Sequence, residues 1–128
     1  MPTTSIYKEK HYAEAIIYLT KALAFDPHYA RAYNNRGLAY YGLKDYGQAI
    51  ADYDRALALD PKLARAYNNR GYASLWLKDA QQAAADFQQA ATLDQGNLNA
   101  AWMTVWVELG KEQPSTEVIT QLPSFRPK

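Results

Sequence analysis

The chain has no cysteine, only two histidines and no long apolar run. Without cysteine it can form no disulfide, no thiolate metal site and no cysteine nucleophile. No apolar stretch approaches the roughly 20 residues that cross a bilayer, and the first residues carry no signal-peptide pattern. We therefore expect neither membrane insertion nor export, and the cytoplasm is the default compartment.

An excess of charge of one sign is also missing. The 14 Lys and Arg side chains face 13 Asp and Glu side chains, which leaves a net charge of +1. Such a balance provides no overall electrostatic field for nucleic acid or an anionic membrane. What the 128 residues do contain is 48% hydrophobic side chains and 11 tyrosines, a composition that indicates one globular domain with a core of its own.

The octapeptide ARAYNNRG occurs twice, from Ala30 to Gly37 and from Ala64 to Gly71. It belongs to a longer repeat, because residues 30–63 and 64–97 are identical at about 19 of 34 aligned positions. The same spacing continues backwards into residues 5–29, where the match is shorter. The chain therefore contains three copies of one unit, and the first copy is incomplete.

Each complete copy predicts two helices. In residues 30–63, Tyr33, Gly37 and Tyr40 fall on one face of the first helix, where the glycine lets a partner helix approach closely. The pattern then breaks at Asp45, which is placed to cap the second helix. That second helix ends before Pro61, because proline cannot continue it.

The spacing Tyr33-x2-Arg36-Gly37-x2-Tyr40…Ala49-x3-Tyr53…Pro61 resembles the signature of the tetratricopeptide repeat family, and residues 64–97 repeat it in part. The resemblance covers roughly residues 5 to 110. It implies an all-α fold, an α-solenoid of antiparallel helix pairs that ends in a C-terminal capping helix. The expected parts are a repeat domain over 1–110 (repeats 5–29, 30–63 and 64–97, capping helix 97–110) and a tail over 111–128.

Arginine stands at positions 36 and 70, where the family usually has leucine. The 34-residue offset also aligns Asp52 with Asp86 on the second helices. Since charges that are partly buried are usually paired, we predict the ion pairs Arg36–Asp52 and Arg70–Asp86 within the two complete repeats.

The two ends of the array are irregular. Only Thr4 to Lys10 remain for the first helix of the first copy, so the apolar face of the next helix, over about His11–Phe25, would be poorly covered. This favours a homo-oligomer that forms through the N-terminal repeat. At the other end, Trp102 and Trp106 lie on the apolar stripe of the predicted capping helix.

Catalysis finds little support in the sequence. The two histidines, His11 and His28, have no recurring acidic or serine partner, and no glycine-rich phosphate loop is present. We therefore expect a protein that is not an enzyme and that uses no metal and no cofactor.

In the family, the first helix of each pair lines the concave surface, and members that hold extended peptides use a ladder of asparagines from successive first helices. Asn35 and Asn69 match that position. Amide side chains both donate and accept hydrogen bonds, arginine grips carboxylates, and aromatic side chains are typical of binding hot spots. The candidate peptide-binding residues are Arg31, Asn34, Asn35, Leu38, Tyr41, Arg65, Asn68, Asn69, Tyr72 and Trp76.

A structural interpretation of the octapeptide stays open. In it the repeated residues are consensus, Asn34 and Asn68 lie in solvent, and Asn35 and Asn69 bridge adjacent repeats. Family members that clamp chaperone C termini also carry a lysine and a further asparagine one turn on. Leu38 occupies that turn here, and the segment for the lysine is nearly absent, which argues against that particular partner.

The sequence thus predicts a non-catalytic protein-interaction module that binds an extended or helical peptide. The peptide is expected to carry acidic side chains where it lies opposite Arg31 and Arg65. Two alternatives remain at this stage. The chain could be a self-associating assembly module that uses its incomplete first repeat, or a regulatory segment of a longer protein.

Overall fold

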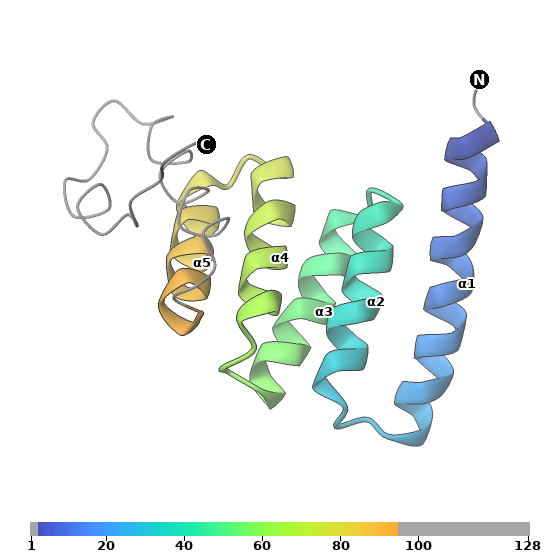
Figure 1. Cartoon of the computed structure of the whole chain (residues 1–128), viewed down its shortest axis with the longest axis horizontal. Helices are drawn as coiled ribbons and strands as arrows, with labels where there is room; N and C mark the ends of the chain where they lie inside the picture. Colours follow the sequence, from blue (N-terminus) through green and yellow to red (C-terminus); the bar gives the residue numbers. More distant parts are fainter. Residues whose placement is uncertain (1–2, 95–128) are drawn as a thin grey trace, which may run out of the picture.

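The computed structural model describes the backbone of residues 3–94 and the side chains of residues 8–94. This part of the chain folds into five helices and contains no strand: α1 (Thr3–Phe25), α2 (Ala30–Gly42), α3 (Tyr46–Leu59), α4 (Ala64–Trp76) and α5 (Ala80–Leu93). The helices stand side by side in chain order, with α1 and α5 at the two ends (Figure 1). The all-α solenoid of helix pairs is confirmed, whereas the predicted capping helix at 97–110 and the tail at 111–128 lie outside the described residues.

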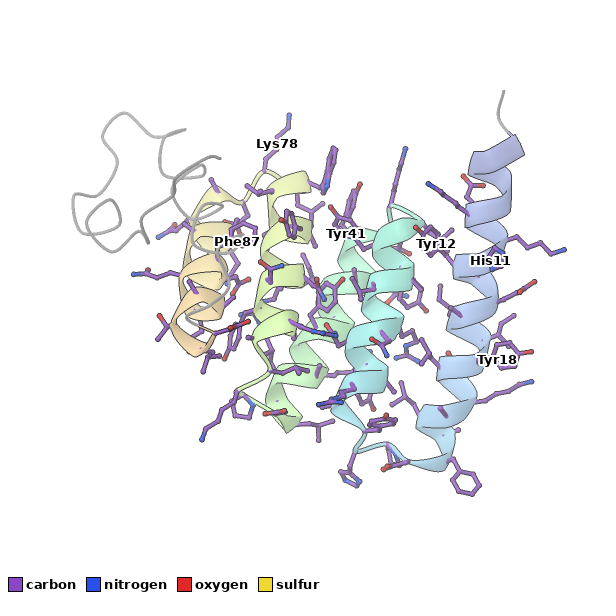
Figure 2. All side chains as sticks on the ribbon, in the orientation of Figure 1. His11, Tyr12, Tyr18, Tyr41, Lys78 and Phe87 are labelled. Carbon is purple, nitrogen blue, oxygen red and sulfur yellow. The ribbon has the colours of Figure 1, made fainter. Side chains whose placement is uncertain are left out.

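One tight turn joins the two helices within each complete repeat. Lys44 and Lys78 adopt left-handed backbone angles, with φ of 64° and 63°. The aspartate that follows caps the next helix. The Asp45 carboxylate accepts a hydrogen bond from the backbone amide of Gln48 at 3.3 Å, and the Asp79 carboxylate accepts one from the backbone amide of Gln82 at 3.1 Å. The cap predicted at Asp45 is confirmed, Asp79 repeats it in the next copy, and Figure 2 shows Lys78 at the exposed turn between α4 and α5.

A different turn joins one repeat to the next. The hydroxyl of Tyr33 donates to the carbonyl of Pro27 at 3.1 Å, and Tyr67 donates to Pro61 at 3.0 Å in the next copy. The Asp60 carboxylate accepts from the backbone amide two residues on. These recurring residues therefore hold the turns between repeats.

The core runs between the helices of each pair and depends on small residues. A Cβ added to Gly37 would lie 2.6 Å from Cε1 of Tyr53, and one added to Gly71 would lie 2.9 Å from Cε1 of Phe87. Both rings are fully buried, and Figure 2 shows Phe87 between α4 and α5. The expected close approach at Gly37 is confirmed, because the aromatic ring of the second helix occupies the space that a side chain would need.

The N-terminal helix differs from the prediction. A break before His11 was expected, but α1 continues from Thr3 to Phe25 without interruption. The physical reason lies at position 11, where histidine replaces the aspartate that caps α3 and α5. Without a carboxylate to cap a new helix, the existing helix continues.

The apolar side chains of α1 fall on two sides. Ile16 and Leu19 are half-buried and Leu23 is buried, on a helix that packs against α2. Tyr18 is 72% exposed, and Figure 2 shows it pointing away from the other helices. No helix within residues 3–94 is long and apolar enough to cross a membrane.

Candidate peptide-binding face

Two arginine–aspartate pairs hold the first helix of each complete repeat to its second helix. Nε and one terminal nitrogen of Arg36 donate to the two carboxylate oxygens of Asp52, at 2.8 and 2.7 Å. Arg70 donates to Asp86 in the same way, at 2.9 and 2.7 Å. Both predicted ion pairs are confirmed. They are bidentate, and the hydrogen bonds that the arginines donate to the carboxylates raise the pKa of each arginine.

Each of these arginines also reaches back to the preceding helix of the array. Arg36 donates to the hydroxyl of Thr20 on α1 at 3.3 Å, and Arg70 donates to Asp54 on α3 at 2.9 Å. Their guanidinium groups are therefore engaged in structural contacts. The arginines left for a ligand are the other pair in the octapeptide, Arg31 and Arg65.

The asparagines of the two octapeptides meet between repeats. The side-chain amide of Asn69 on α4 donates to the carbonyl oxygen of Asn34 on α2 at 3.0 Å, and Asn34 is only 4% exposed. The structural interpretation placed Asn34 in solvent and Asn35 in the bridge, and both placements are wrong. Asn34 takes part in the bridge and Asn35 is exposed, because Asn34 lies on the side of α2 that faces α4.

One hollow of about 520 Å³ lies where α2 and α4 begin, and we call it the arginine hollow. It brings together four of the predicted site residues, and its other walls come from the turns before the two helices and from the end of α5. The lining residues are Tyr29, Arg31, Asn34, Asn35, Leu63, Ala64, Arg65 and Asp94. Within the described residues, neither Arg31 nor Arg65 forms an ion pair.

A second hollow of about 270 Å³ lies further along the same two helices, and we call it the tyrosine hollow. It gathers four more predicted residues, Leu38, Tyr41, Asn69 and Tyr72, around one that was not predicted, Tyr53 of α3. In the sequence Tyr53 stands out only as part of the repeat spacing Ala49-x3-Tyr53. The signal that could have identified it is the change from Tyr53 to Phe87 between the aligned repeats, which adds one hydroxyl to an otherwise identical position.

The remaining two predicted residues line neither hollow. Trp76 is 61% exposed at the end of α4, where its indole nitrogen donates to the hydroxyl of Tyr41 at 2.6 Å and its ring stacks on Tyr46 with 5.8 Å between centroids. Burial raises the pKa of Tyr41. Asn68 is half-buried, and its carbonyl oxygen has no hydrogen-bond partner within the part of the chain that the structure describes.

The histidines take no part in this face. His11 lies on α1 and His28 in the turn before α2, where its backbone amide donates to Asp26 at 3.1 Å. Among residues 8–94, no three His, Asp or Glu side chains are grouped closely enough to hold a metal ion. The chemistry available on the face of α2 and α4 is therefore that of amides, guanidinium groups and aromatic rings.

Comparison with known proteins agrees with this architecture. Two models, each described as a tetratricopeptide repeat, match residues 30–63 and 64–97. The chain is 30% identical to the solved Arabidopsis OM64 TPR domain, with a TM-score of 0.77 over 84% of this chain and 89% of that one. A search of curated proteins gave no match.

Two further solved structures carry bound peptides. The first TPR of Spaghetti (RPAP3), bound to the HSP90 peptide SRMEEVD, is 29% identical, with a TM-score of 0.77 and coverage of 84% and 85% of the two chains. The second TPR domain of human RPAP3, in complex with the HSP70 peptide SGPTIEEVD, is 30% identical, with a TM-score of 0.73 and coverage of 81% and 87%. With two matching repeat models and relatives at this level of identity over most of its length, the chain belongs to the tetratricopeptide repeat family.

Proposed function

We propose that this chain is a non-catalytic protein-interaction module that binds an acidic peptide along the shared face of α2 and α4. The single observation that carries the proposal is the arginine hollow, in which Arg31 and Arg65 lie together without an ion pair among the described residues. Two exposed guanidinium groups in one concavity favour an anionic ligand, since each can grip a carboxylate with two hydrogen bonds.

The surroundings of the two arginines support a peptide as the ligand. Asn35 is exposed beside Arg31 and offers both a donor and an acceptor, which suits the backbone of an extended chain. The hollow also contains one acidic side chain, that of Asp94, so an incoming acidic peptide meets two positive charges and one negative charge. The local balance is positive although the whole chain is nearly neutral.

The structural neighbours give the proposal a starting ligand. The peptides named with them, SRMEEVD and SGPTIEEVD, both end in EEVD and are both rich in carboxylates. We carry over only this acidic character, because Leu38 and Tyr72 stand where the chaperone-clamping relatives have an asparagine. An acidic C-terminal peptide is therefore the ligand class to try first.

The test uses SRMEEVD as the probe and calorimetric titration of the full chain as the measurement. We expect SRMEEVD to bind more tightly than the analogue SRMQQVN, in which amides replace the three acidic side chains. In the variant Arg31→Ala/Arg65→Ala, binding should weaken by roughly tenfold or more, because charge-assisted hydrogen bonds are lost. Raising the salt concentration should weaken binding by the unaltered chain as well.

The matched control is Lys10→Ala/Lys21→Ala, which removes the same two positive charges from exposed positions of α1. This variant should bind SRMEEVD as the unaltered chain does. Equal binding of SRMEEVD and SRMQQVN, or an equal loss in the two double variants, would show that Arg31 and Arg65 do not hold an acidic peptide.

A second candidate function is self-association through α1. The observation that favours it is the exposure of large apolar side chains on this helix, among them Ile17 and Tyr18. Sedimentation of the full chain over a range of concentrations should then show a dimer or larger species, which Ile17→Ser/Tyr18→Ser converts to monomer. A monomer at every concentration excludes this candidate and leaves the peptide-binding proposal untouched.

A further inference from the structure

The tyrosine hollow contains a large apolar side chain that the packing of the helices does not explain. Leu38 lines this hollow, is 42% exposed and belongs to no cluster of the core within the described residues. The same position in the next repeat is Tyr72, which lines the hollow as well and is half-buried. Two successive repeats therefore place an apolar side chain at the hollow, and the fold buries neither of them completely.

The chemistry of the hollow favours an apolar occupant. None of its lining side chains carries a charge, so a carboxylate or ammonium group placed there would lose its hydration and gain no counter-ion. Tyr53 is fully buried together with its hydroxyl, which therefore offers no hydrogen bond to an occupant. An apolar side chain needs no such partner, and its contact with Leu38 removes apolar surface of both from water.

The two tyrosines that line the hollow are held in place by their own neighbours. The hydroxyl of Tyr41 accepts a hydrogen bond from the indole nitrogen of Trp76 at 2.6 Å, and its ring meets Tyr46 edge-on with 5.4 Å between centroids. The ring of Tyr72 meets Phe87 edge-on at 5.1 Å. Because these contacts fix both rings before a ligand arrives, binding does not have to order them.

The size of the hollow indicates one side chain. Pockets that enclose whole small molecules measure roughly 300–1,000 Å³, whereas this hollow measures about 270 Å³. The rest of such a ligand must therefore lie outside the hollow.

The spacing of the two hollows fits one peptide. Leu38 follows Arg31 by seven residues on α2, and Tyr72 follows Arg65 by seven residues on α4. Seven residues are two helical turns, so each pair lies on one side of its helix with about 10 Å between its members. An extended peptide advances about 3.3 Å per residue, and three or four of its residues cover this distance.

We propose that the tyrosine hollow is a specificity pocket for one apolar side chain of the bound peptide, three or four residues away from the acidic group that Arg31 and Arg65 hold. The spacing rests on the proposed function, whereas the pocket can be tested without an acidic peptide.

The first experiment measures, by calorimetric titration of the full chain, how the position of a single leucine changes the binding of an acidic peptide. All peptides are acetylated and amidated, so that two adjacent glutamates carry their only charges. SSLSSEES and SEESSLSS place leucine three and four residues from the glutamates, and SSSSLEES and SEELSSSS place it one and two residues away. We expect the better of the first two to bind roughly fivefold more tightly than the leucine-free SSSSSEES, and the other two to stay within about twofold of it.

The variant Leu38→Ser removes the exposed apolar side chain from the hollow. It should reduce the gain from leucine to less than about twofold. The matched control is Leu59→Ser, which should keep the gain, because Leu59 is 40% exposed at the end of α3 and lines neither hollow. The proposal is overturned if neither SSLSSEES nor SEESSLSS binds better than SSSSSEES, if leucine next to the glutamates gives the same gain, or if Leu38→Ser keeps the gain in full.

A second measurement tests the hollow without an acidic peptide. In NMR titrations of the full chain, N-acetyl-leucine methylamide should shift the backbone amide signals of Tyr41 and Tyr72, and N-acetyl-serine methylamide should not. These shifts should persist in Arg31→Ala/Arg65→Ala, because the hollow does not include either arginine. Shifts without binding of SRMEEVD would support the pocket and contradict the acidic-peptide proposal, whereas binding of SRMEEVD without shifts would contradict the pocket alone.

Discussion

The repeats at residues 30–63 and 64–97 begin with the same eight residues, yet their asparagines have different surroundings. Asn34 is buried and accepts a hydrogen bond, while its counterpart Asn68 is half-buried with an oxygen that is unpaired among the described residues. Asn35 is exposed in the arginine hollow, while Asn69 bonds to Asn34 and lines the tyrosine hollow.

The surroundings of a residue in this solenoid depend on its neighbours one repeat away. Residues that contact the partner helix of their own repeat behave alike in both copies, as the pairs Arg36–Asp52 and Arg70–Asp86 do. Residues that face the adjacent repeat differ among the described residues, because α2 meets α4 on the side that carries Asn34, whereas α4 meets α2 on the side that carries Asn69. Identical sequence therefore yields shared packing and divergent surface chemistry.

Among the contacts that both repeats share, the buried aspartates should contribute most to the free energy of unfolding. Asp52→Ala and Asp86→Ala should each lower the free energy of unfolding by about 3–5 kcal/mol, because each leaves a partly buried arginine without its carboxylate. Denaturation in urea followed by circular dichroism measures the change. Asp54→Ala is the control, since Asp54 is exposed and pairs with Arg70 at the surface, where the loss should be about 0–1 kcal/mol.

If Asp52→Ala costs no more than Asp54→Ala, the ion pair within the repeat does not stabilise the fold. If the losses in unfolding free energy for Asp52→Ala and Asp86→Ala differ by more than about 2 kcal/mol, the arginine–aspartate pair does not stabilise the two repeats equally.

The glycines offer a graded test of the same shared packing. Gly37→Ala should destabilise the fold by about 1–3 kcal/mol, because the new Cβ would meet the Tyr53 ring at 2.6 Å and the Ala49 carbonyl oxygen at 3.1 Å. Gly71→Ala should cost less, since its closest atoms are those of the Phe87 ring, at 2.9 Å. Thermal unfolding of the unaltered protein, Gly37→Ala and Gly71→Ala gives the order of their stabilities.

Gly47→Ala is the matched control for these substitutions. Nothing lies within 4 Å of a Cβ at Gly47 in α3, so the change should stabilise the helix by about 0.5–1 kcal/mol. A stabilising effect at Gly37 as well would contradict the close approach of α2 and α3.

The smallest change in unfolding free energy is expected at the asparagines, whose surroundings differ between the two copies. Asn34→Ala removes the bond to Asn69 and should lower the free energy of unfolding by about 1–2 kcal/mol. Asn35→Ala, one residue further on, should change it by less than about 0.5 kcal/mol, because Asn35 is exposed. Urea denaturation of both variants measures the two losses. Equal losses would mean that the hydrogen bond between the repeats contributes nothing to stability.

Much of this architecture could be predicted from local signals. The caps at Asp45 and Asp79 and the stop at Pro61 mark helix boundaries through backbone chemistry that operates within a few residues. The continuous helix α1 also has a local signal, since His11 replaces the capping aspartate, and this signal outweighs the repeat period that predicts a break there.

The repeat, the helix pairs and the two arginine–aspartate pairs can all be derived from the sequence, because the 34-residue period places each interacting residue at a constant distance along the chain. Three features depend on the tertiary structure: which asparagine bridges the repeats, that Arg31 and Arg65 share one hollow, and that Tyr53 lines the other. These features depend on how one helix pair is rotated against the next. That rotation follows from side-chain packing across the whole interface, which no single segment of the sequence specifies.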